Sequence, residues 1–335
     1  MSFRDTHIGL AHGNGGRLMR ELIEELFLPA LSNPHLDIGA DAVAIPLPAD
    51  RDLIVTTDGF TVQPLEFPGG NIGSLAVHGT VNDLAVSGAV PRFMTLSVFL
   101  EEGLEVALLR RVVGALAAAA RDCAVAVVAG DTKVLGRGDC DGIYLATTGV
   151  GFRPRGVRFG LNRVRPGDRI LVSGPIGDHG AAVMLARQEF GLRGDLKSDA
   201  ASVLGQSQAL MTVQGVRFMR DPTRGGLATV AHEIARAAGL TVRLVEAHIP
   251  VNDAVQSVCE LLGFDPLYLA CEGRIVAVVA PGAADAALAQ LRTVAPRAAL
   301  VGESQAGAPQ VVLETGFGGQ RSIDELEDDP LPRIC

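Results

Sequence analysis

Residues 105–133 read EVALLRRVVGALAAAARDCAVAVVAGDTK, and their pattern indicates the class of the fold. The Ala-rich first part predicts a helix over 105–121. The apolar run 124–129 predicts a buried strand that leads into a loop, Gly130-Asp131-Thr132-Lys133. A helix followed directly by a buried strand is typical of α/β proteins.

The same alternation continues on both sides of this stretch. Apolar residues four apart predict a helix over 17–28, the run 53–57 predicts a strand, and 74–87 is expected to be helical. Further strands are expected at 143–149, 169–172, 240–245 and 274–280, and further helices at 227–238, 255–262 and 283–294. The Arg-, Pro- and Gly-rich stretch 151–167 predicts a domain junction.

These patterns divide the chain into four parts. We expect an N-terminal glycine-rich loop and helix at 1–36, an N-terminal domain at 37–155, a C-terminal α/β domain at 156–318 and a tail at 319–335. The length of 335 residues suits two domains of ordinary size.

Composition excludes several classes of protein. A net charge of −9 argues against a general nucleic-acid binder, which needs a basic face. The apolar runs are too short for a membrane span, and the N-terminus has no signal-peptide pattern. The five cysteines lack metal-ligand spacing, so we expect free thiols in the reducing cytoplasm.

Four aspartates stand beside small or polar residues in the first half: Asp41, Asp58, Asp83 and Asp131. A single Asp-Gly pair is most simply a turn. Four of them at strand ends and in a helix are expected to meet at one sheet edge, where carboxylates suit Mg²⁺ bound to nucleotide phosphates. Lys133, one of only two lysines, adds a positive charge there. The chain has no Walker sequence, so a nucleotide must be held in another way.

The chain stops at Pro330-Leu331-Pro332-Arg333-Ile334-Cys335, just after the acids Asp324, Glu325, Glu327, Asp328 and Asp329. Two prolines and five acids predict a solvated arm, which spans up to roughly 50 Å from Gly319 if it is extended. Its last side chain is a nucleophilic thiol. The alternative is a frayed end that happens to be cysteine.

These motifs resemble the HypE family of hydrogenase maturation factors. That family lies within the ATP-binding superfamily of aminoimidazole ribonucleotide synthetase, selenophosphate synthetase and thiamine-monophosphate kinase. The resemblance covers nearly the whole chain, and the ending Pro332-Arg333-Ile334-Cys335 is specific to this branch. The shared segments are 11–16, 56–73, 79–89, Gly130-Asp131-Thr132-Lys133-Val134 and Asp221-Pro222-Thr223-Arg224-Gly225-Gly226.

The resemblance implies a two-domain fold like that of aminoimidazole ribonucleotide synthetase. In a homodimer, the N-terminal domains would pair into a barrel-like sheet in which the strands near 53–57 and 143–149 bury their edges. The tail would be flexible. No nucleic acid and no membrane are implied.

The implied activity is an ATP- and Mg²⁺-dependent carbamoyl dehydration in the cytoplasm. A carbamoyltransferase, HypF, loads a carbamoyl group onto Cys335, and the enzyme converts the S-carboxamide to a thiocyanate. The cyano group then passes to the iron of [NiFe]-hydrogenase through a HypC–HypD scaffold.

The implied site residues fall into three groups. Catalysis is assigned to Cys335, Lys133 and Glu272. Nucleotide binding is assigned to Gly13, Gly15, Gly16, Asp58, Asn82, Thr132, Lys133 and Asp221. Metal binding is assigned to Asp41, Asp83 and Asp131. Asp41 departs from the superfamily motif, since Ala40 replaces the first of two acids; His12, His78, His179 and Cys271 receive no role.

Two rival functions remain at this stage. A selenophosphate synthetase-like enzyme relies on a reactive residue near its N-terminus, and no cysteine precedes Cys123 here. A non-catalytic docking scaffold would not need Lys133 among the acid motifs and would not turn over ATP.

Overall fold

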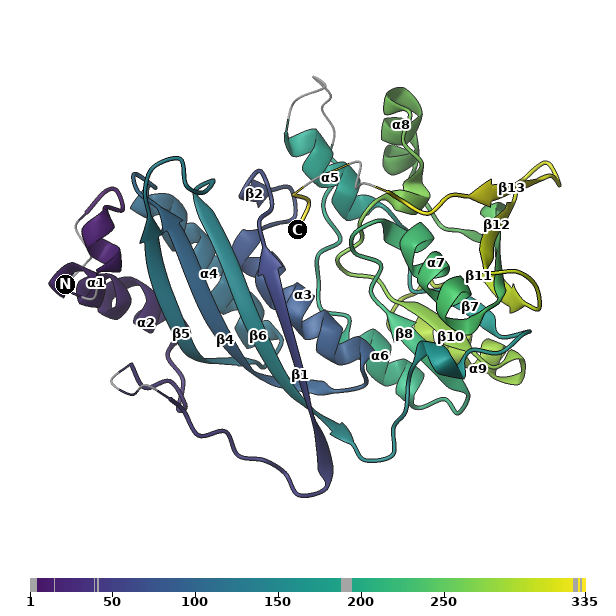
Figure 1. Ribbon diagram of the computed structural model, residues 1–335, viewed down its shortest axis with the longest axis horizontal. Helices are drawn as coiled ribbons and strands as arrows, with labels where there is room; N and C mark the ends of the chain where they lie inside the picture. The colour runs from purple at the N-terminus through teal and green to yellow at the C-terminus, as the bar shows by residue number, and fades with distance from the viewer. Residues whose placement is uncertain are drawn as a thin grey trace.

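The structure is a computed structural model that describes residues 5–14, 16–38, 40, 42–187, 195–327, 331 and 333–335. Two domains lie side by side, each built on its own main β-sheet (Figure 1). The N-terminal sheet has the strand order β1-β6-β4-β5, and the C-terminal sheet has the order β13-β12-β9-β11-β7-β10-β8.

The N-terminal sheet consists of β1 (Arg51–Phe60), β4 (Val90–Glu101), β5 (Ala126–Leu135) and β6 (Ile143–Pro154). β6 pairs antiparallel with both β1 and β4, whereas β4 and β5 are parallel. One face packs against α3 (Ile72–Val86) and, beside it, α4 (Val106–Asp122), which contacts both α3 and β5. The other face is more open, and Leu53 and Val55 on it are 50% and 56% exposed.

Helix α3 is buried on nearly all sides, which explains why its apolar residues are spread around the helix rather than gathered on one face. Asn71 begins it by accepting hydrogen bonds from the backbone N–H groups of Gly73 and Ser74. The helix packs against the sheet and α4. It also contacts α6 (Leu204–Met211), a helix of the C-terminal domain. It therefore forms the wall that the two domains share (Figure 1).

The C-terminal sheet is antiparallel apart from the parallel pair β9–β12. Its strands are β7 (Arg169–Val172), β8 (Val216–Arg220), β9 (Thr241–Val245), β10 (Val276–Val279), β11 (Ala299–Gln305), β12 (Gln310–Glu314) and β13 (Gln320–Ile323). Its remaining helices are α5 (Asp178–Ala186), α7 (Gly226–Ala238), α8 (Asp253–Leu262) and α9 (Ala284–Arg292). Within the described residues, no helix is both long and apolar enough to cross a membrane.

The structure confirms the predicted helices and strands but corrects three expectations. Residues 130–133 lie inside β5 rather than in a loop, because β4 continues to pair with them as far as Leu135. β6 is an inner strand whose two edges are both paired within the chain, so it has no free edge to bury in a dimer. The chain from Gly319 is not all tail, since β13 pairs with β12.

The N-terminal helix also differs in detail. It runs as α1 (Arg17–Leu22), a π-helical turn (Ile23–Phe27) and α2 (Leu28–Leu31), and so extends beyond the predicted end at residue 28. Its buried side chains Leu22, Leu26 and Phe27 belong to the predicted apolar stripe.

The close crossing of α3 and α4 gives a first prediction. A methyl group added at Gly73 would overlap the carbonyl oxygen of Val112, so Gly73→Ala should lower the free energy of unfolding by about 2–3 kcal/mol. Gly114→Ala, on the open side of α4, meets no atom within 4 Å and should raise it by up to about 1 kcal/mol. Urea denaturation of both variants tests this, and equal effects would contradict the close packing.

Candidate active site

Four carboxylates gather where the two domains meet. Asp58 lies in β1 and Asp83 in α3, while Asp221 follows β8 and Glu272 precedes β10. Thr56 donates its hydroxyl hydrogen to Asp83 over 2.7 Å, which fixes that carboxylate at the junction. Asp221 and Glu272 are 4% and 1% exposed. The structure thus unites Asp58, Asp83, Asp221 and Glu272, which the sequence had assigned to three different roles.

Asn82 joins the two domains at this junction. Its side-chain amide donates to the backbone oxygens of Ala201 and Glu272, over 3.0 and 2.9 Å, and accepts from the N–H of Val203 over 2.8 Å. The residue is fully buried. Both amide hydrogens bond to protein, so Asn82 links the domains, and its assignment to nucleotide binding stays a prediction.

The environment of Glu272 suits a proton acceptor. Burial raises its pKa well above the ordinary value, and the charges of Asp221, Asp199, Asp58 and Asp83 raise it further. Its Oε1 atom is buried and has no hydrogen-bond partner among the described residues. Burial also raises the pKa of Asp221, to about 7, with the Asp83 charge as the next cause.

This arrangement fits a bound cation, since a positive charge would relieve four crowded carboxylates. Arg224 is a cation that acts on Asp58 and lowers its pKa, but burial still leaves that pKa raised. Among the described residues, no three His, Cys, Asp or Glu side chains are arranged as ligands of a metal ion. Asp41, one of the three expected ligands, lies outside the described residues.

Within one chain, Asp131 and Lys133 lie away from the four carboxylates at the domain junction. Strand register places Asp58 opposite Thr147, Thr147 opposite Leu96, and Leu96 opposite Gly130, all on the face that α3 covers. Asp131 is one residue further along, so it points to the open face. It is also at the opposite edge of the sheet, three strand spacings or roughly 14 Å away. The expected meeting of Asp83 and Asp131 within one chain is therefore wrong.

Asp131 and Lys133 form an ion pair of 3.0 Å in which both side chains are 54% exposed. The N-terminal glycine loop lies beside them: a methyl group at Gly13 would stand 2.6 Å from the backbone nitrogen of Val134. Gly16 precedes α1 in the same region, and Gly15 lies outside the described residues. The site residues of the sequence thus form two groups, one at the domain junction and one along β5.

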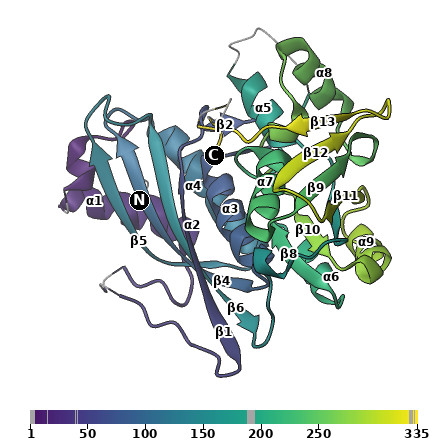
Figure 2. The same cartoon turned by 45° about the vertical axis from the view of Figure 1, so that its right-hand side comes forward.

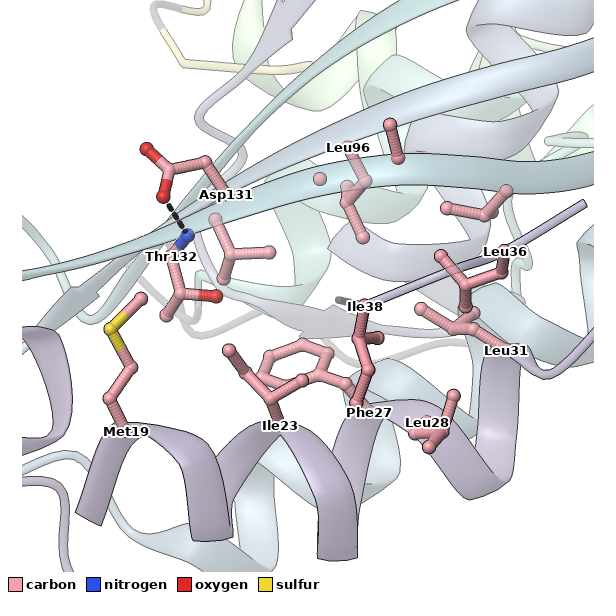
Figure 3. Close-up of a pocket in the computed structure, with 14 residues that line it drawn as sticks. Met19, Ile23, Phe27, Leu28, Leu31, Leu36, Ile38, Leu96, Asp131 and Thr132 are labelled. Atoms are coloured by element: carbon pink, nitrogen blue, oxygen red, sulfur yellow. Dashed lines mark hydrogen bonds between the residues drawn. The ribbon is translucent and has the colours of Figure 1, made fainter. Parts of the chain in front are cut away.

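A cavity of about 120 Å³ adjoins the β5 group (Figure 3). Its walls are mostly apolar side chains from the N-terminal helix and the sheet, such as Ile23, Phe27 and Leu96. Thr132, which is buried, points towards this helix, whereas the Asp131 carboxylate points away and accepts from the N–H of Thr132 over 2.9 Å (Figure 3). Among the described residues that line it, Asp131 is the one charged group, so the cavity is mainly an apolar pocket.

The C-terminus docks between the domains, beside β2 (Glu66–Phe67) and α5 (Figure 2). The N–H groups of Thr61 and Gln63 donate to the carbonyl oxygens of Cys335 and Arg333, each over 3.1 Å. Leu331 and Ile334 are 6% and 2% exposed within the main apolar core. The expectation of a solvated, flexible arm is thus corrected for its last residues, because these two apolar side chains have a place to pack.

Arg333 shapes the docked end. Its φ of +59° lies in the left-handed region, which costs about 1 kcal/mol in a residue other than glycine. An ion pair of 2.5 Å with Asp141 and a position 5.9 Å from the centre of the Tyr144 ring offset this cost. The sequence pattern did not predict this docking site for the tail, although the spacing of Leu331 and Ile334 after an acidic segment is a signal for it.

The residues left without a role are mostly structural. His12 is buried and bonds to Gly9 and Asp5, which shapes the N-terminal loop. Burial lowers the pKa of His78, and the charge of Asp122 on α4 acts in the opposite direction. Burial raises the pKa of the Cys271 thiol, which accepts from the N–H of Gly177. His179 is different, because it contacts the tail: its Nε2 lies 2.8 Å from the oxygen of Ile334.

Comparison with known proteins places this geometry in a family. Residues 39–152 match the N-terminal domain of AIR synthase related proteins, and residues 165–314 match their C-terminal domain. The chain is 46% identical to the carbamoyl dehydratase HypE of Bradyrhizobium diazoefficiens, over 100% of this chain and 98% of that protein.

Two solved structures are also similar. One is the hydrogenase maturation protein HypE in complex with ATP, with a TM-score of 0.93 and 43% identity over 98% of this chain and 99% of that one. The other is a HypE–HypF complex, with a TM-score of 0.79 and 39% identity over 93% of this chain and 100% of the matched chain.

The buried acid cluster predicts a pH-dependent stability. The pKa of Asp221 is about 7 in the folded chain and 3.8 as its ordinary value, so folding binds a proton between these pH values. The stability cost of this side chain is absent below about pH 4 and complete above about pH 7. Asp221→Asn should therefore raise the free energy of unfolding at pH 8 by about 1–3 kcal/mol, and the gain should shrink as the pH falls.

Thermal melts at pH 8 and pH 5 measure this effect. Asp50→Asn is the control, because the Asp50 side chain is 78% exposed and should give no such gain. A destabilised Asp221→Asn protein at pH 8 would contradict the electrostatic argument.

Proposed function

The chain belongs to the family of carbamoyl dehydratase HypE, within the AIR synthase related proteins, and we propose from this that it uses ATP to dehydrate a carbamoyl group carried on Cys335. The product is an S-cyanide whose cyano group serves as a ligand of the [NiFe]-hydrogenase iron. The activity is thus a step of hydrogenase maturation.

One observation supports this function above the others: a short series of contacts connects the terminal thiol residue to the proposed base. The oxygen of Ile334 contacts His179, which contacts Ser198 over 2.8 Å. The next residue, Asp199, accepts from the N–H of Glu272 over 3.0 Å. Cys335 and Glu272 are therefore anchored to the same loop at the domain junction.

The chemistry explains why a carboxylate is needed near the thiol. An amide oxygen is a poor leaving group, and ATP, when bound, supplies the phosphoryl group that lets it leave as phosphate. The carbon–oxygen bond then breaks, both N–H protons depart, and a carbon–nitrogen triple bond forms. We assign the removal of a proton to Glu272, whose raised pKa makes it a stronger base than an exposed carboxylate.

The junction carboxylates would also hold Mg²⁺. We propose Asp83 as a ligand, with Asp58 and Asp221 close to it, because their mutual repulsion favours a divalent cation. A cation there would lower the pKa of Glu272 and so release its proton when the nucleotide is present. Asp41 and Asp131 remain proposed ligands as well.

Lys133 reaches such a site only from a second subunit. We propose a homodimer in which the free β5 edge of one chain lies along the free β1 edge of the other. This closes the two sheets into a barrel and buries the half-exposed Leu53 and Val55. It also places the β5 edge of one chain, which carries Asp131, Lys133 and the neighbouring N-terminal glycine loop, next to β1 of the other chain, which carries Asp58.

Partners follow from the same family. We propose a HypF-like carbamoyltransferase as the donor, since a related protein forms a HypE–HypF complex, and a HypC–HypD complex as the acceptor of the cyano group. The five free cysteines agree with a cytoplasmic location. Both rival functions are weaker, because the relatives match over the full chain and because a scaffold needs no buried Glu272.

Loading and dehydration are separable by mass spectrometry of the C-terminal peptide. With carbamoyltransferase, carbamoyl phosphate and ATP, Cys335 should first gain a carboxamide and then lose one water. Cys335→Ala should abolish both changes. Lys133→Ala or Glu272→Gln should still load but accumulate carboxamide, with dehydration slowed by about 100-fold or more. An adduct on Cys259 or Cys271, which are buried, would contradict the assignment.

The shared site predicts complementation between inactive variants. Mixing Lys133→Ala with Glu272→Gln subunits, with exchange of partners, should restore dehydration, because a mixed dimer has one intact junction that combines Lys133 and Glu272 from different chains. Mixing Lys133→Ala with a Lys133→Ala, Glu272→Gln double variant is the control and should stay inactive. No recovery in the first mixture would mean that each site lies within one chain.

A further inference from the structure

We propose that His179 is a positioning residue that holds the C-terminal tail in place for reaction at Cys335. The proposal rests on the proposed function in one respect, namely that Cys335 carries the reacting group. The contact itself is a property of the fold, and it ties the tail to the loop that carries Glu272.

The hydrogen bonds define one form of the imidazole. The Nε2 atom lies 2.8 Å from the carbonyl oxygen of Ile334, which only accepts, so Nε2 carries the hydrogen. The Nδ1 atom, 2.8 Å from Ser198 Oγ, then accepts the serine hydroxyl hydrogen. The same Oγ accepts from the N–H of Ala200 over 3.0 Å, so the serine hydrogen is free to point to the ring.

The surroundings keep the ring neutral and fixed. His179 is fully buried, and the Phe67 ring packs edge-on against it with centres 5.4 Å apart. Burial lowers the pKa of His179 to about 4. The hydrogen bond to the tail therefore keeps its direction throughout the physiological pH range.

Helix α5 and its C-terminal cap form hydrogen bonds with the tail at two points. His179 lies in its first turn and contacts Ile334, and Arg187 at its C-terminal cap donates to the oxygen of Arg333 over 2.9 Å. Arg187 also donates to the oxygen of Gln63, which lies on the other side of the tail. The tail is thus held between α5 of one domain and residues 61–63 of the other.

The contact continues to the proposed base. The Ser198 backbone N–H donates to the oxygen of Pro68, which anchors the loop to the N-terminal domain. Asp199 accepts from the N–H groups of Glu272 and Gly273, over 3.0 and 3.3 Å. His179 is the side chain that joins this loop to the tail, so its loss should free the tail without removing any group that takes part in the chemistry.

Alkylation of the terminal thiol measures tail release directly. Iodoacetamide is added to the native protein at fixed pH, without ATP or any partner, and the rate of Cys335 modification is followed by peptide mass spectrometry. The other four cysteines are buried and Cys335 is only partly so, which makes Cys335 the reporting thiol. A net contribution of about 1–1.5 kcal/mol from the lost hydrogen bond corresponds to a rate increase of roughly 5–10-fold.

His179→Leu should show this increase, and His179→Gln, which keeps an N–H donor, should show a smaller one. The matched control is His232→Leu. His232 makes the same kind of bond, from Nε2 to the oxygen of Ile323 over 3.0 Å, but upstream of the tail. It should leave the Cys335 rate unchanged. A parent-like rate in a folded His179→Leu protein overturns the proposal.

Ser198→Ala covers the case in which His179→Leu fails to fold. It removes the hydroxyl that orients the ring and should speed Cys335 alkylation about 2–5-fold; a parent-like rate then overturns the proposal. Because the assay needs no carbamoylation, it also separates the two ideas. Faster alkylation with no carbamoyl adduct on the parent protein would support the tail contact and refute the proposed function.

Discussion

The buried side chain of Asn82 is the contact on which the junction of the two domains depends. Its amide forms three hydrogen bonds, two of them to the segments that carry Glu272 and Ala201. These three bonds stabilise the buried interface, and any shift would leave polar groups without partners at a cost of about 1–3 kcal/mol each. The position of Glu272 relative to α3 is thus set by a neighbour of Asp83 rather than by Glu272 itself.

That rigidity is needed because the junction gathers charges that repel. Burial and mutual proximity raise the pKa values of Asp58, Asp221 and Glu272. Such a cluster weakens the folded state unless a cation or a proton occupies it. The apolar core around α3 offsets this loss of stability. The cluster leaves Glu272 as a buried carboxylate with a raised pKa.

The second constraint is the pleat of the N-terminal sheet. Alternate residues of a strand point to opposite faces, so Asp58 and Asp131 are on different sides even though both stand in acid motifs of the same sheet. Within one chain, the β5 group and the junction group are therefore separate. The docked tail is held by two kinds of contact. The side chains of Leu331 and Ile334 are buried in the apolar core, and the backbone oxygens of Arg333 and Cys335 accept hydrogen bonds.

The helices and strands of both domains, the acid motifs and the terminal position of Cys335 could be read from the sequence alone. The apolar periodicity of helices and strands is a local property of the sequence. A terminal cysteine after an acidic segment is also visible without a structure. The sequence did not reveal that residues 130–133 continue a strand, that Asn82 bonds to the backbone of Glu272, or that the tail docks against His179. Each of these depends on pairing between segments far apart in the chain. Lys133 faces the open side because it lies opposite Phe99, and His179 meets Ile334 across 155 positions. Tertiary packing alone fixes such contacts, since a residue's own neighbours carry no information about which distant backbone will reach it.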